Sequence, residues 1–208
     1  MPAVSPPLVR RDDALNSYII PDRDLQLEDR QALRKAARDA LVFAATANGV
    51  GIVTDSSGLT VRIVEPFGDL AFGASSATTN SFITAALVAG TESAVVNQTL
   101  PNNVYHVFYG CGIETVLPNV TPASVLLRFL QGSSGSTILR VHLEELYSNG
   151  NQNAPFVGWF SYPVLYKPSQ AEWIGLTPRI SAAGGERVVL YGYIGENRGR
   201  NVAGPESL

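Results

Sequence analysis

The chain is poor in charged residues, and it holds few histidines and cysteines. Asp, Glu, Lys and Arg together make up 16% of its 208 residues, against about 25% in an average soluble protein. The net charge is −3 at pH 7, so the chain lacks the clustered basic charge with which proteins bind nucleic acid. The single cysteine, Cys111, excludes an internal disulfide framework. The sequence therefore predicts neither a nucleic-acid partner nor a fold held by disulfides.

Long hydrophobic runs are also absent. No stretch approaches the roughly 20 apolar residues that a membrane-spanning helix needs. Residues 1–20 lack the apolar segment of a secretory signal, because Pro6, Pro7, Arg10 and Asp13 interrupt it. We expect a protein that is made in the cytoplasm and has no membrane partner.

Motifs for catalysis, metals and cofactors are missing as well. His106, His142 and Cys111 lie far apart in the sequence, and their spacing matches no zinc site. The chain contains no G-x-S-x-G nucleophile motif, no P-loop and no G-x-G-x-x-G. We therefore expect no catalytic residues, no metal and no cofactor, with His106 a structural residue of a strand. A hydrolase on a β-scaffold is left as an alternative that no motif supports.

The sequence is rich in small and uncharged polar residues, mainly Ser, Thr, Asn, Gly and Ala. Of its 15 basic residues only Lys35 and Lys167 are lysines, and the others are arginines. Protein interfaces are depleted in Lys and Glu and enriched in Arg and Tyr. This composition favours a subunit whose surface is largely covered by partners. The alternative is a neutral, secreted β-protein that stays monomeric.

The first 48 residues differ from the rest. Residues 1–24 predict an extended arm, because the Pro-rich start favours a polyproline II conformation. Residues 25–48 predict one α-helix, from about Leu27 to Ala47, with Asp24 as a candidate N-cap. Apolar residues recur there at helical spacing and form one stripe, which consists of Leu33, Ala37, Ala40, Leu41 and Ala44.

Residues 49–195 predict a β-domain, and residues 196–208 a flexible tail. Apolar and polar residues alternate in this domain, and clusters of Gly, Ser, Asn and Asp separate the alternating stretches. Eight or more strands without intervening helices predict an all-β fold: an antiparallel β-sandwich, jelly roll or barrel. The candidate strands are Ile52–Thr54, Leu59–Val64, Ser81–Ala89, Ala94–Gln98, Val104–Cys111, Ser124–Leu130, Thr137–Tyr147, Val157–Leu165 and Arg187–Ile194.

Aromatic residues crowd one segment of the β-domain, FVGWFSYPVLYKPSQAEW. Pro163 and Pro168 interrupt it, which predicts an edge strand followed by loops. Exposed aromatic rings on a sandwich stack on sugars or anchor protein interfaces, whereas buried rings fill the core, and the sequence leaves both readings open. The rings concerned are Trp159, Tyr162, Tyr166 and Trp173. If they are exposed, they favour the alternative function of a carbohydrate-binding module that recognises a host surface, with these rings as its stacking platform.

The order of these parts resembles that of known virion proteins. An N-terminal arm (MPAVSPPLVRRDDALNSYIIPDRD), one helix and a Ser/Thr/Asn/Gly-rich β-domain look like the accessory structural proteins of tailed bacteriophages, above all the head decoration (cement) proteins. The resemblance implies a β-sandwich or β-barrel body, a homo-oligomer, most often a trimer, and arms that extend over the major capsid protein. It places the chain in the virion, with a tail, neck or baseplate subunit as the alternative.

The arm supplies the residues expected to bind a partner. Residues up to Asp39 carry seven charges of each sign, unlike the basic arms of coat proteins that package RNA. We expect the arm to add to the sheet edge of a neighbouring subunit. The apolar anchors would be Leu8, Val9, Tyr18, Ile19 and Ile20, with Arg10 and Arg11 as polar contacts.

Overall fold

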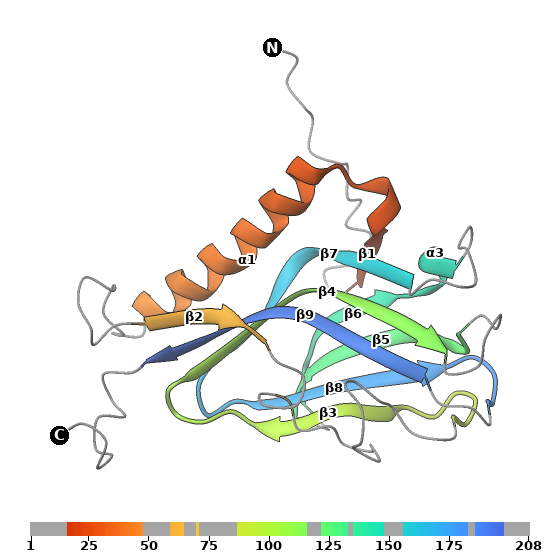
Figure 1. The fold of residues 1–208 in the computed structure, drawn as a ribbon. Helices are drawn as coiled ribbons and strands as arrows, with labels where there is room; N and C mark the ends of the chain where they lie inside the picture. The colour runs from red at the N-terminus through yellow and green to blue at the C-terminus, as the bar shows by residue number, and fades with distance from the viewer. Residues whose placement is uncertain are drawn as a thin grey trace.

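The computed structural model describes residues 16–47, 59–64, 70, 87–115, 122–132, 135–147, 156–182 and 186–197. Eight strands form two antiparallel four-stranded sheets that pack face to face, so the predicted all-β sandwich is confirmed (Figure 1). The first sheet has the order β2 (Leu59–Ile63), β9 (Glu186–Asn197), β4 (Val104–Thr115), β7 (Phe156–Tyr166). The second sheet has the order β3 (Ser93–Thr99), β8 (Ala171–Pro178), β5 (Ser124–Gln131), β6 (Thr137–His142).

A ninth strand, β1 (Asn16–Pro21), joins the two sheets along one side. Its first half pairs in parallel with β6, with Tyr18 opposite His142. Its second half pairs antiparallel with β7, with Ile20 opposite Trp159. Residues 16–21 of the expected free arm are therefore part of the sandwich, because two sheet edges with unpaired backbone groups flank them.

The single long helix, α1 (Leu27–Ala47), has the expected bounds and lies across the outer face of the first sheet (Figure 1). Ala37, Leu41 and Ala44 of the predicted stripe are buried against that sheet. The N-cap prediction was wrong. Asp24 lies in a short 3₁₀ helix, η1 (Asp22–Asp24), and Gln26 accepts the first helical hydrogen bond, from the N–H of Arg30.

Strand β4 shows how the sequence pattern follows from this layering. Tyr105, Val107 and Tyr109 face α1, whereas Phe108 and Ile113 face the second sheet. Both faces of β4 are thus covered, so its sequence is almost continuously apolar. The core between the sheets is built from the inward residues of both sheets, with Phe129 and Phe160 meeting edge to face at 5.3 Å.

Three strand predictions need correction. The candidate Thr137–Tyr147 ends as a strand at His142, and a short helix, α3 (Glu144–Tyr147), follows. The segment containing Pro163 is strand β7, which lies between β4 and β1, but β1 pairs only with residues 158–160 and Pro163 lies where the pairing with β4 is irregular. Strand β8 (Ala171–Pro178) is an inner strand, whereas the sequence predicted loops for its first residues, up to Trp173, and no strand after them. Candidate Ile52–Thr54 lies outside the described residues, as does most of Ser81–Ala89, of which Leu87 forms an isolated bridge with Ala182.

The connections between strands are unequal at the two ends of the sandwich. Because the strands alternate in direction, residues 100–103, 132–136 and 167–170 connect strands at one end. The longer connections, residues 64–92, 116–123, 143–155 and 179–185, all belong to the other end. Long connections are where sandwiches commonly carry binding functions.

Candidate functional site

The arm residues that the structure describes lie in the chain's own sheets. Ile19 is buried in the core, and Gly158 of β7, whose partner in the ladder is Pro21, has no room for a side chain, since a Cβ there would lie 2.5 Å from Cγ1 of Ile19. Ile20 packs against the cluster beneath α1, and Tyr18 pairs with β6 through its backbone. The sequence had suggested that these three residues bind a neighbouring subunit. The structure instead places them in the sheets of their own chain. Leu8, Val9, Arg10 and Arg11 lie outside the described residues.

Trp159 fastens helix α1 to the first sheet. Its ring stacks on Tyr109, with centroids 5.5 Å apart and planes within 6°. The indole N–H donates a 2.6 Å hydrogen bond to Oδ1 of Asp22, and the guanidinium of Arg34 lies 5.6 Å from the ring centroid. Each of these contacts is internal, so Trp159 holds the fold together and presents no stacking face to solvent.

The other three rings of the aromatic segment are also turned to internal contacts. The Tyr166 hydroxyl donates to the carbonyls of Leu130 (3.0 Å) and Trp173 (3.3 Å), and burial raises the pKa of this phenol. Trp173 is buried, and Tyr162 is half-buried against the core. The sandwich therefore does not gather these four residues into an exposed sugar platform, because two inner strands, β7 and β8, carry them.

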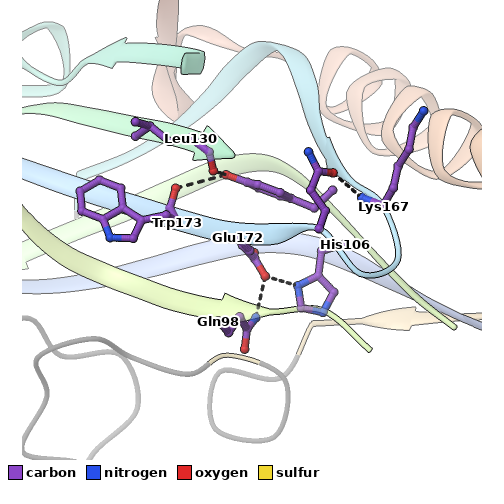
Figure 2. Close-up of polar contacts among 8 residues, drawn as sticks. Gln98, His106, Leu130, Lys167, Glu172 and Trp173 are labelled. Atoms are coloured by element: carbon purple, nitrogen blue, oxygen red, sulfur yellow. Dashed lines mark hydrogen bonds and ion pairs between the residues drawn. The ribbon is translucent and has the colours of Figure 1, made fainter. Parts of the chain in front are cut away.

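A buried polar cluster ties the two sheets together (Figure 2). Glu172 of β8 accepts a 2.6 Å hydrogen bond from Nε2 of Gln98 on β3. The same oxygen lies 3.0 Å from Nδ1 of His106 on β4, without the alignment of a hydrogen bond. His106 is 1% exposed and Glu172 is fully buried, so a substrate cannot reach either group. The expectation that His106 is structural agrees with this position.

The sequence contains one signal for this cluster, although no motif marks it. Strand alternation puts His106 on the same face as Val104 and Phe108, both of which point into the core. A polar residue at an inward position needs a polar partner, because an unpaired buried group is costly. Which partner it finds depends on the packing of the two sheets, and only the structure shows Glu172.

A second buried carboxylate lies at the end with the long connections. Glu186, at the start of β9, accepts hydrogen bonds from the backbone N–H of Ala123, and from the N–H (3.3 Å) and the hydroxyl of Ser124 at the start of β5. Burial raises the pKa of Glu186, while these three donors act in the opposite direction. The contact joins the first sheet to the second.

Beside Glu186 lies a cleft of about 430 Å³ with a mainly apolar lining. An ion pair of 2.7 Å between Arg179 and Glu144 lines it, together with the exposed side chain of Ile180. Tyr147 also lines it, and burial raises the pKa of this phenol well above its usual value. The cleft has the size of a small-ligand site, but few polar groups point into it.

The described residues contain neither a metal-binding cluster nor a membrane-spanning helix. Within residues 16–197, apart from the stretches left undescribed, no three His, Cys, Asp or Glu side chains lie close enough to hold a metal ion. Among the helices described, none has the length and apolar character that crossing a membrane requires.

Comparisons with known proteins give little beyond a distant likeness of fold. No family model and no curated protein matches the chain. A chain of the disulfide-linked pili that form Bacillus endospore appendages is similar over 71% of this chain and 97% of its own, with 10% identity and a TM-score of 0.29. A chain of infectious bursal disease virus, Gx strain, is similar over 72% of this chain and 38% of its own, with 10% identity and a TM-score of 0.31. TM-scores this low carry no functional conclusion for this chain.

Proposed function

We propose that the chain is a non-enzymatic structural subunit of a virion, and specifically a decoration (cement) subunit on a bacteriophage head. The strand order supports this. Two sheets ordered β2-β9-β4-β7 and β3-β8-β5-β6 have the connectivity of a jelly roll, an arrangement of eight strands in two Greek keys that is common in viral capsid proteins and lectins. The closed interior favours a structural subunit over an enzyme, because His106 and Glu172 are sealed from substrate.

The surface supports assembly. Large apolar side chains are exposed on α1, on β2 and in the longer connections between strands. Phe43 is 76% exposed and Ile63 is 66% exposed. Charged residues are only 16% of the chain, against about 25% in an average soluble protein. Exposed apolar side chains of this kind are available for contacts with other proteins, and such contacts require that they gather into one patch. The proposed partners are further copies of the chain, as a trimer, and the major capsid protein.

The proposed arm is now shorter than the sequence suggested. Because β1 is fixed between β6 and β7, the residues left to reach a partner are 1–15, which include Leu8, Val9, Arg10 and Arg11. Strand β1 would anchor the base of this arm in the sandwich. A force on the arm would then act on the backbone hydrogen bonds of β1 and not on a loop.

Deleting residues 2–12, which spares β1, tests this function. The full chain should sediment at a multiple of 22.2 kDa and decorate particles formed by the capsid protein encoded beside it. The deleted chain should keep its circular dichroism spectrum and thermal midpoint but lose attachment to the particle. A full chain that stays at 22.2 kDa at all concentrations and binds no particle would refute the proposal.

A further inference from the structure

Strand β3 is an open sheet edge in the described structure. It pairs with β8 on one side, and no other described strand pairs with it. Strand β1 pairs with residues 140–142 of β6 and residues 158–160 of β7, so β3 and β2 are the two ends of the described strand order. An open edge presents unpaired backbone N–H and C=O groups to any strand that can reach it.

The register shows which backbone groups of β3 point outward. The N–H of Leu100 donates to the carbonyl of Gln170 at 3.0 Å, so Leu100 faces β8. In an antiparallel ladder the residues face the neighbouring strand alternately. Asn97 and Thr99, paired with Trp173 and Ala171, therefore direct their N–H and C=O groups away from β8, and both side chains are exposed.

Strand β3 lacks two of the features that usually protect an edge, charge and proline, although its pairing with β8 is irregular between Ala94 and Val96. Ser93–Thr99 contains no charged residue and no proline, and both would discourage pairing. Glu92, just before the strand, is held by Arg128, whose Nε donates to it at 2.8 Å. The other edge, β2, has only five residues and carries Arg62, in a 2.9 Å ion pair with Glu196. The two edges are therefore not equivalent as binding surfaces.

We propose that β3 pairs antiparallel with β3 of a second copy of this chain, across a two-fold axis near Val96. A two-fold contact places the same surface on both sides, so any charge in the strand would lie close to its own copy. Seven uncharged residues avoid that repulsion, which Arg62 would cause at the edge of β2. The second sheets of the two copies then form one continuous sheet.

The matched variants Asn97→Pro and Asn97→Thr test the pairing in the full chain. Both replace the same exposed side chain, but only proline removes the outward N–H, and neither alters a bond to β8. In analytical ultracentrifugation over a range of concentrations, Asn97→Thr should form an assembly joined by the two-fold contact, either a dimer or a pair of the proposed trimers. The dissociation constant of that contact should be at least about tenfold higher for Asn97→Pro. Equal dimerisation of the two variants, or a full chain that is monomeric throughout, would overturn the proposal.

Two further measurements keep the test decisive. If Asn97→Pro unfolds, Asn97→Lys replaces it, because it puts two like charges near the axis and should also weaken the dimer. In Asn97→Cys, a short thiol cross-linker should give a covalent dimer, while buried Cys111 leaves the parent chain uncoupled. Deleting residues 2–12 should not change this cross-link. A cross-link that forms only after the deletion would show that the N-terminal segment fills the edge in the full chain, and would overturn the proposal without refuting the structural role.

Discussion

The two sides of the sandwich are joined in different ways. On the closed side, β1 connects β6 to β7 through backbone pairing, and Ile19 fills the core beneath it. On the open side, where β2 and β3 end, no described strand crosses between the sheets, and Gln98 of β3 reaches inward to Glu172, close to His106 of the other sheet. On the closed side, β1 pairs with the backbone groups of both sheets and so keeps strands of other molecules from pairing there. Side-chain contacts hold the sheets together but leave the edges available.

Replacing Ile19 with alanine should be the most damaging change, because it weakens the closed side. Ile19 is buried in a tight site against Gly158, so the free energy of unfolding should fall by about 2–5 kcal/mol. Chemical denaturation followed by circular dichroism measures this loss. Ile63→Ala, at an exposed position on β2, is the matched control and should change stability by less than about 0.5 kcal/mol. Similar losses in the two variants would contradict the role given to β1.

Removing Glu172 should weaken the open side by a smaller amount. In Glu172→Leu, Nε2 of Gln98 loses this acceptor and Nδ1 of His106 loses the carboxylate 3.0 Å away. We expect a loss of about 1–3 kcal/mol in the free energy of unfolding, the cost of buried groups left unsatisfied. The double variant with His106→Leu should recover part of the loss, because it removes one of those groups.

The control for this change is Glu144→Leu, which breaks the exposed ion pair with Arg179. An exposed pair contributes only about 0–1 kcal/mol, so this variant should be nearly as stable as the parent. Strictly additive effects of Glu172→Leu and His106→Leu would show that the two side chains do not interact.

Replacing Glu186 with glutamine should have the smallest effect and should appear as a change in pH dependence. Burial raises the pKa of Glu186, so the folded chain binds this proton more tightly than the unfolded chain does. The free energy of unfolding should therefore decrease as the pH rises from the ordinary carboxyl range through the raised pKa, and this contribution should be constant above it. Denaturation curves at a series of pH values, compared with Glu186→Gln, isolate the contribution.

The amide fits the site of Glu186 because its oxygen accepts from the two backbone N–H groups and its NH₂ donates to the Ser124 hydroxyl. Glu186→Gln should remain folded, and its free energy of unfolding should not show the decrease with rising pH that Glu186 causes. An identical pH dependence in both proteins would mean that Glu186 does not titrate differently on folding.

Local sequence patterns predicted where helices and strands lie better than they predicted which strands pair with each other. The stripe of Ala37 and Leu41 located α1 to the residue, and alternation located most strands to within a few positions. The errors at Pro163 and at Ala171–Pro178 have one cause, since a proline was taken as the mark of an edge. Pairing is set by which strands meet in space, and a local irregularity in the β4–β7 ladder accommodates Pro163.

The candidate surfaces were less predictable for the same reason. The segment around Trp159 and Trp173 is aromatic in any fold, but the sequence does not say whether an aromatic ring faces water, a helix or the other sheet. Trp159 is buried because α1, more than a hundred residues earlier in the chain, lies over it. Contacts between residues so distant in sequence leave no local pattern.

By itself the sequence determined an all-β fold with one long helix, and left a sandwich, a jelly roll and a barrel open, because hydrophobic periodicity reports which face of each element is buried but not how the sheets close. Tertiary structure alone decided that residues 16–21 close one side of the sandwich, that His106 meets Glu172, and that β3 is left at an edge. These outcomes depend on the order in which strands pair across the whole chain. Every residue except proline offers the same backbone donor and acceptor, so a strand's own sequence does not specify which strand it pairs with.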